Sequence, residues 1–132
     1  MKSFSRYVVA ALGIGALIAI AMSCGDSKPT PPPGLSETQL AGWNAYVTLD
    51  CGSCHGDQRQ GKRSGPALAG LDQHWTEEQL VAYLGDPQAM IKVTPRLAFK
   101  SEQYAIAMPA YGEKADQETL EALTNYLLVD FD

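Results

Sequence analysis

Two cysteines and a histidine stand within five residues of one another, in the run Cys51-Gly52-Ser53-Cys54-His55. Thiols three residues apart on one helical turn project to the same side, so both could form thioethers with the vinyl groups along one porphyrin edge. The histidine that follows would then lie under the macrocycle, where its imidazole could bind iron. The pattern therefore predicts covalent attachment of one haem c through Cys51 and Cys54, with His55 as the proximal ligand.

The motif alone leaves two other uses of the cysteine pair open. A thioredoxin-type redox pair would need a surrounding βαβ pattern, and no alternating strands are visible in this sequence. A zinc site could combine Cys51 and Cys54 with His55 or His74, but a second C-x-x-C and a spaced histidine pair are both missing. The context favours haem over both.

An iron bound by one histidine needs a second axial ligand or stays open to small molecules. Outside the N-terminal segment discussed below, the methionines are Met90 and Met108. Met108 is followed by Pro109 in a segment that predicts a loop, and such a loop could hold a thioether rigidly. Met90 lies in an expected helix, where a methionine usually fills the core. We favour Met108 as the sixth ligand, with Met90, His74 and an open site as the alternatives.

Helices must position the motif. Ser36 and Gln39 form a capping-box pattern that starts a helix running to about Asp50, which delivers the chain to the motif. Its apolar face is expected to hold Leu40, Trp43 and Val47. Thr76 and Gln79 repeat the capping pattern, and Asp86-Pro87 starts a further short helix. Residues 90–104 match no assignable pattern.

A last helix is predicted to begin at Asp116 as the N-cap. Its apolar positions are Leu120, Leu123, Leu127 and Phe131. Gly42 on the first helix and Tyr126 on the last are the ingredients of a close helix crossing, because glycine lets another backbone or ring approach.

The segment 56–70 has four glycines and reads as a loop that wraps one face of the haem. It also contains three basic residues, Arg59, Lys62 and Arg63. We expect them on a solvated loop face.

The N-terminus resembles a bacterial lipoprotein signal peptide. Two basic residues precede an apolar run of 16 residues, Tyr7 to Met22, which is short for a membrane span. Cys24 follows after Ser23 and also accounts for the odd third cysteine. Residues 1–23 are therefore expected to be removed, Cys24 to be lipidated, and residues 24–34, which are rich in proline, to form an extended tether. The alternatives are an ordinary cleaved signal peptide with a spare thiol and an uncleaved signal anchor.

The mature chain is expected to be acidic. Without residues 1–23, eight basic residues remain against fifteen acidic ones, a formal charge of −7. Such a charge disfavours nucleic-acid binding, because phosphates would be repelled. It favours redox partners with a basic docking face.

These residues together resemble the class I c-type cytochromes over about residues 35–132. The attachment motif, Met108-Pro109, Gly42, Tyr46 and Tyr126 carry the resemblance, and residues 65–70 resemble the family's proline loop. The resemblance implies an all-α domain of four to five helices around one haem, and a Pro66 carbonyl that accepts the other ring N–H of His55.

The function implied is that of a non-enzymatic, one-electron carrier outside the cytoplasm, on the periplasmic side, anchored to a membrane through Cys24. A haem enzyme or gas sensor with an open sixth site, or a haem subunit of a larger oxidoreductase, is the alternative.

Overall fold

The computed structural model describes residues 29–130, so the signal segment, Cys24 and Phe131 lie outside the described residues. Within them the chain forms six α-helices and one short 3-10 helix, and no strand. The helices are α1 (Glu37–Thr48), α2 (Cys51–His55), α3 (Glu77–Gly85), α4 (Pro87–Val93), α5 (Pro95–Ser101) and α6 (Gln117–Leu127), with the 3-10 helix at Leu71–Gln73. The predicted all-α class is confirmed, with one or two helices more than expected.

The predicted helix starts are confirmed at the level of single hydrogen bonds. Ser36 and Gln39 close a capping box on α1, and Thr76 and Gln79 close one on α3. The carboxylate of Asp86 accepts from the Ala89 amide at 3.0 Å, which caps α4. These local bonds satisfy amide groups that the first turn of a helix leaves without partners.

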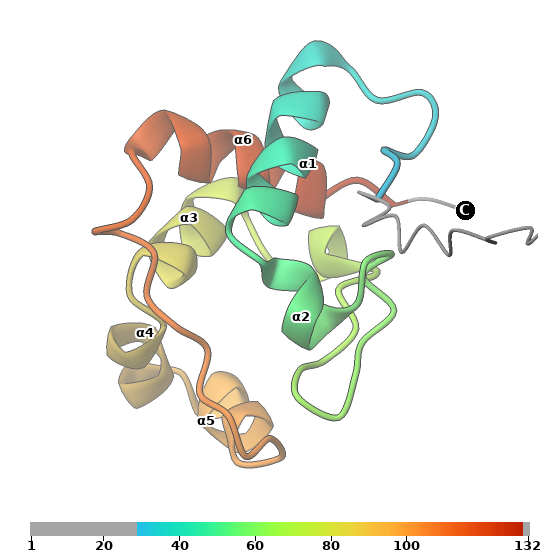
Figure 1. The fold of residues 1–132 in the computed structure, drawn as a ribbon. Coiled ribbons are helices and arrows are strands. Elements are labelled where there is room, and N and C mark those ends of the chain that lie inside the picture. Colours follow the sequence, from blue (N-terminus) through green and yellow to red (C-terminus); the bar gives the residue numbers. More distant parts are fainter. Residues whose placement is uncertain (1–28, 131–132) are drawn as a thin grey trace, which may run out of the picture.

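Helices α1 and α6 cross at the centre of the domain (Figure 1). A Cβ added to Gly42 would lie 2.0 Å from the Ala122 carbonyl oxygen, so only glycine allows this approach. The rings of Tyr46 and Tyr126 meet edge to face with centroids 5.6 Å apart. The predicted close crossing is therefore confirmed.

The buried face of α1 differs from the expected one. It holds Gly42, Trp43, Ala45 and Tyr46, whereas Leu40 is 40% exposed. The close approach at Gly42 turns the helix so that the glycine faces α6, and Leu40 consequently lies at the edge of the contact.

Helix α5 lies in the stretch that the sequence left unassigned. Pro95 occupies its first turn, where a proline costs no hydrogen bond, just as Pro87 does in α4. Figure 1 shows α4 and α5 at the lower left, with the segment after α5 running back up to α6.

The described part of the proline-rich tether lies against the domain instead of extending away from it. Pro29, Pro31 and Pro32 are half-buried. Pro29 lines a small cavity together with Tyr46 on α1 and Gly52 on α2. Among the residues that the structure describes, no helix has the length and apolar character needed to cross a membrane.

Candidate haem site

Helix α2 consists of the attachment motif itself. It begins after Asp50, whose backbone is left-handed with φ 57°, so the chain turns sharply between the end of α1 and Cys51. Cys51 is buried and Cys54 is half-buried, and both are free thiols. Two unpaired sulfurs three residues apart on one short helix are the donor set that two thioether bonds to one haem edge require.

The ring of His55 is buried and held from one side. Its Nδ1 lies 2.8 Å from the Pro66 carbonyl oxygen. A carbonyl can only accept, so Nδ1 carries the proton and Nε2 keeps its lone pair for a metal. A Cβ added to Gly65 would lie 3.1 Å from the same ring, so the loop packs closely on it. The hydrogen bond implied by the resemblance is present, and the ring is oriented as an iron ligand needs.

The environment of the cysteines does not suit the two alternative uses. Burial raises the pKa of the Cys51 thiol to about 11, whereas a redox-active cysteine pair needs a lowered thiol pKa. No group of three or more His, Cys, Asp or Glu side chains within residues 29–130 could hold a metal ion, which removes support for a zinc site. The donors present fit a haem better than either.

Tyr46 connects α1 to the residue directly after the motif. Its buried hydroxyl donates to the Gly56 carbonyl oxygen at 2.6 Å, and burial raises the pKa of this hydroxyl well above its usual range. Replacing Tyr46 with phenylalanine should lower the free energy of unfolding by about 0.5–1.5 kcal/mol, because the Gly56 carbonyl loses one of its two donors and keeps only the Arg59 amide. Denaturant unfolding of the haem-loaded protein measures this, and an unchanged midpoint would contradict it.

The segment that contains Met108 is fastened to the end of α3. The amides of Tyr111 and Gly112 donate to the carbonyls of Leu84 and Gly85 at 2.9 and 3.2 Å. Met108 is half-buried and packs against the core. Its role as the sixth ligand stays a prediction.

The two alternatives to Met108 lie in different surroundings. Met90 is half-buried on α4, and His74 is exposed. Neither belongs to the group of apolar side chains that packs on the core, whereas Met108 does.

Tyr111 is a residue of this region that the sequence did not single out. It is buried, and its hydroxyl lies 3.5 Å from the Leu49 carbonyl oxygen at the end of α1. Burial raises the pKa of this hydroxyl to about 12. Tyr111 therefore connects the Met108 segment to the turn before α2. Its position three residues after Met108 is the sequence signal that could have pointed to this role.

The expectation of a solvated basic loop is wrong for one of its three residues. Arg59 is only 5% exposed. The ammonium group of Lys62 donates to the Gly52 carbonyl at 2.8 Å and to the Ser53 carbonyl at 3.4 Å. Lys62 and Arg63 are both exposed, as expected. The carbonyls at the C-terminal end of α6 hold the Arg59 guanidinium away from solvent, and that contact depends on the folded chain.

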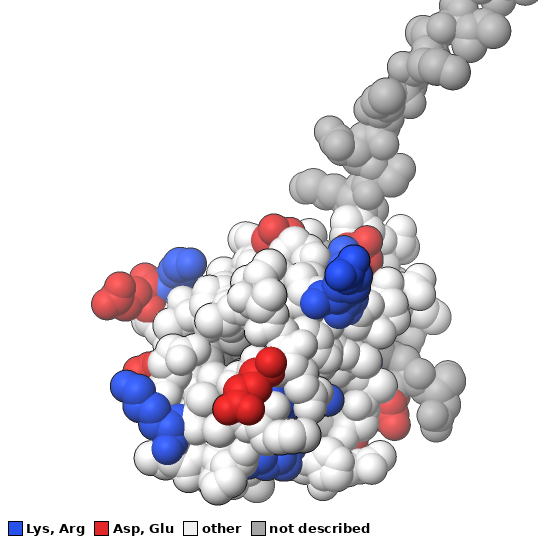
Figure 2. Space-filling model, turned by 90° about the horizontal axis from the view of Figure 1, so that it is seen from below, with Lys and Arg blue, Asp and Glu red and all other residues white. Residues whose placement is uncertain are grey.

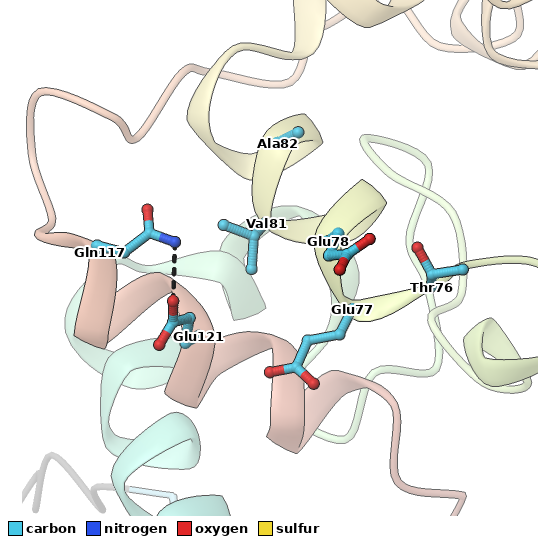
Figure 3. A pocket seen from close by; sticks show the side chains of 7 residues that line it. All are labelled: Thr76, Glu77, Glu78, Val81, Ala82, Gln117 and Glu121. Carbon is cyan, nitrogen blue, oxygen red and sulfur yellow. Dashed lines mark hydrogen bonds between the residues drawn. The ribbon is translucent and has the colours of Figure 1, made fainter.

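A larger hollow, of about 800 Å³, lies between α3 and α6 (Figure 3). Three carboxylates line it, those of Glu77, Glu78 and Glu121, and the amide of Gln117 donates to Glu121 at 2.9 Å. None of the predicted site residues lines this hollow. It is therefore separate from the candidate haem site.

Comparison with known proteins agrees with the geometry. The description of the matching family is Cytochrome c, and its model covers residues 39–129, more than half of the chain. No curated protein and no solved structure gives a significant match. The matched range contains both thiols, the oriented imidazole and the Met108 segment, and with it we conclude that the chain belongs to the cytochrome c family and carries covalently bound haem c.

Proposed function

We propose that the protein is a membrane-tethered carrier that passes one electron at a time between two redox proteins outside the cytoplasm. The observation that supports this most is the arrangement on α2, in which two free thiols accompany a buried imidazole whose Nδ1 is engaged by Pro66. An electron-carrying haem protein is what the family match indicates.

When bound, the haem supplies the one-electron couple of its iron. The chain's own residues would hold it in place, Cys51 and Cys54 through thioethers and His55 and Met108 as axial ligands. The Pro66 carbonyl fixes the imidazole ring, so the ligand does not need to reorient when the charge of the site changes. The packed core behind α2 excludes water from this side.

The proposed partners are a donor and an acceptor with basic docking faces, because the mature chain is strongly acidic. The surface seen from below, where α2 and α5 lie, is mostly uncharged, with acidic and basic side chains in small separate groups (Figure 2). The negative charge would therefore steer partners from a distance, and close contact on this face would mostly involve uncharged side chains.

The anchor has its own test in the native host. We expect membrane-purified protein to show the mass of one haem plus acyl chains on Cys24, together with a low-spin haem spectrum. A Cys24→Ser variant should keep the spectrum and move to the soluble fraction, because the acyl chains supply the membrane affinity. A Cys24→Ser variant that stays in the membrane, or an unmodified thiol in the wild type, would refute the lipid anchor. Colourless protein would refute the carrier.

A further inference from the structure

Arg59 ties the loop after the attachment motif to the far end of the chain. Its guanidinium donates to the carbonyl oxygens of Tyr126 and Leu127, both at 3.1 Å, and of Val129 at 2.8 Å. The first two of these carbonyls belong to the last residues of α6, and that of Val129 lies just beyond its end. The guanidinium carbon also lies 5.0 Å from the centre of the Tyr126 ring.

The end of α6 suits a buried cation. The last carbonyls of a helix have no partner within it, and the helix dipole places partial negative charge there. Burial lowers the pKa of Arg59, and the nearby Tyr126, Tyr46 and Asp130 act in the opposite direction. The guanidinium stays charged at neutral pH, since no environment in a protein deprotonates arginine.

The backbone of Arg59 forms hydrogen bonds near both ends of the segment that runs from His55 to Pro66. Its amide donates to the Gly56 carbonyl at 2.9 Å, one residue after His55, and its carbonyl accepts from the Leu68 amide at 2.9 Å, two residues after Pro66. Arg59 also has a left-handed backbone, with φ 59°, which is uncommon for a residue other than glycine. A residue held in this conformation needs its surroundings to fix it, and the side chain supplies three hydrogen bonds that do so.

We propose that Arg59 is a positioning residue for the haem ligand. By fastening the loop to α6, it keeps the Pro66 carbonyl facing Nδ1 of His55. The proposal rests on the proposed role of His55 as an iron ligand. The proposed role goes beyond helix capping, because it links the end of α6 to the basicity of the His55 imidazole.

The sign of the effect on the redox potential separates positioning from charge. A hydrogen bond from Nδ1 makes the imidazole a stronger donor, which favours ferric iron. Loosening that bond should therefore raise the potential. Removing a buried positive charge near the iron would instead lower the potential, because the ferric state carries the additional positive charge.

Arg59→Lys is the decisive variant, because it keeps the charge and loses the fork that reaches three carbonyls. We expect its haem-loaded form to have a higher redox potential than the wild type. By NMR, its His55 Nδ1 proton should exchange with solvent about tenfold faster, on the order expected when one hydrogen bond to a charged group is lost. The matched control is Arg63→Lys, an exposed position on the same loop, which should change neither quantity.

Wild-type values of both quantities in Arg59→Lys would overturn the proposal and leave Arg59 as a helix cap only. A lowered potential would overturn it as well. If the variant does not accumulate, hydrogen exchange in the wild type gives a second test, because the Leu68 and Leu128 amides should open in one cooperative step. Separate openings would refute the link. A wild type without histidine-ligated haem would refute the proposed function instead, and its spectrum would show this before any variant is made.

Discussion

Replacing Met108 with leucine should remove the methionine-to-iron charge-transfer band from the ferric spectrum and lower the redox potential. The fall should be on the order of 0.2 V, a fraction of the range of about 0.8 V over which axial ligands set haem potentials. The reason is that a thioether ligand raises the potential of a histidine-ligated haem, and leucine offers no donor atom. Spectroelectrochemical titration of the purified protein measures both quantities.

Met90→Leu is the matched control for this substitution. It also removes a thioether, but from α4, at a half-buried position that does not pack on the core cluster. We expect its band and its potential to remain those of the wild type. The opposite pattern, with the band lost in Met90→Leu and retained in Met108→Leu, would reassign the sixth ligand. A band unaffected by either change would leave no methionine on the iron.

Gly42→Ala should destabilise the fold by about 3 kcal/mol or more, the upper end of the cost of overpacking a well-packed contact. The new Cβ would lie 2.0 Å from the Ala122 carbonyl oxygen and 2.6 Å from Tyr126 Cβ. The nearest atom belongs to the backbone, so α1 and α6 would have to move apart along their whole contact. Denaturant unfolding of the haem-loaded protein gives the free energy.

Gly85→Ala is the matched control, because it adds the same methyl group to another glycine of a helix and should not destabilise the fold. A Cβ at Gly85, the last residue of α3, meets nothing within 4 Å. Alanine is the better helix former, so this variant should be as stable as the wild type or more stable by up to about 1 kcal/mol. Equal losses in the two variants would mean that the Gly42 contact is not what limits the packing of α1 on α6.

Local signals in the sequence predicted the parts of the fold that depend on neighbouring residues. Three helix caps, those at Ser36, Thr76 and Asp86, involve partners only three residues away. They can therefore be predicted from the sequence alone. The close crossing at Gly42 was also predictable, because a glycine within a helix usually has a packing reason.

The features that the sequence did not predict depend on distant partners. Arg59 looks like any loop cation until α6 brings its carbonyls within reach, 67 to 70 residues further along the chain. Helix α5 is an exception, because it was left unassigned although it contacts α4, its neighbour along the chain. The contact between His55 and Pro66 was predicted only through the resemblance to a family, since no spacing rule alone brings a carbonyl to a ring nitrogen eleven residues away.

The position of Pro29 limits how the domain can be oriented on its anchor. Pro29 shares a cavity with Gly52 of the attachment helix, so the described chain begins beside α2. With the acyl chains on Cys24, five residue steps of at most about 3.5 Å each separate the bilayer from this point. The domain would then be held close to the lipid surface and would be unable to tumble freely. Under the proposed lipid anchor, electron exchange with proteins embedded in the same membrane would be favoured over exchange with freely diffusing ones.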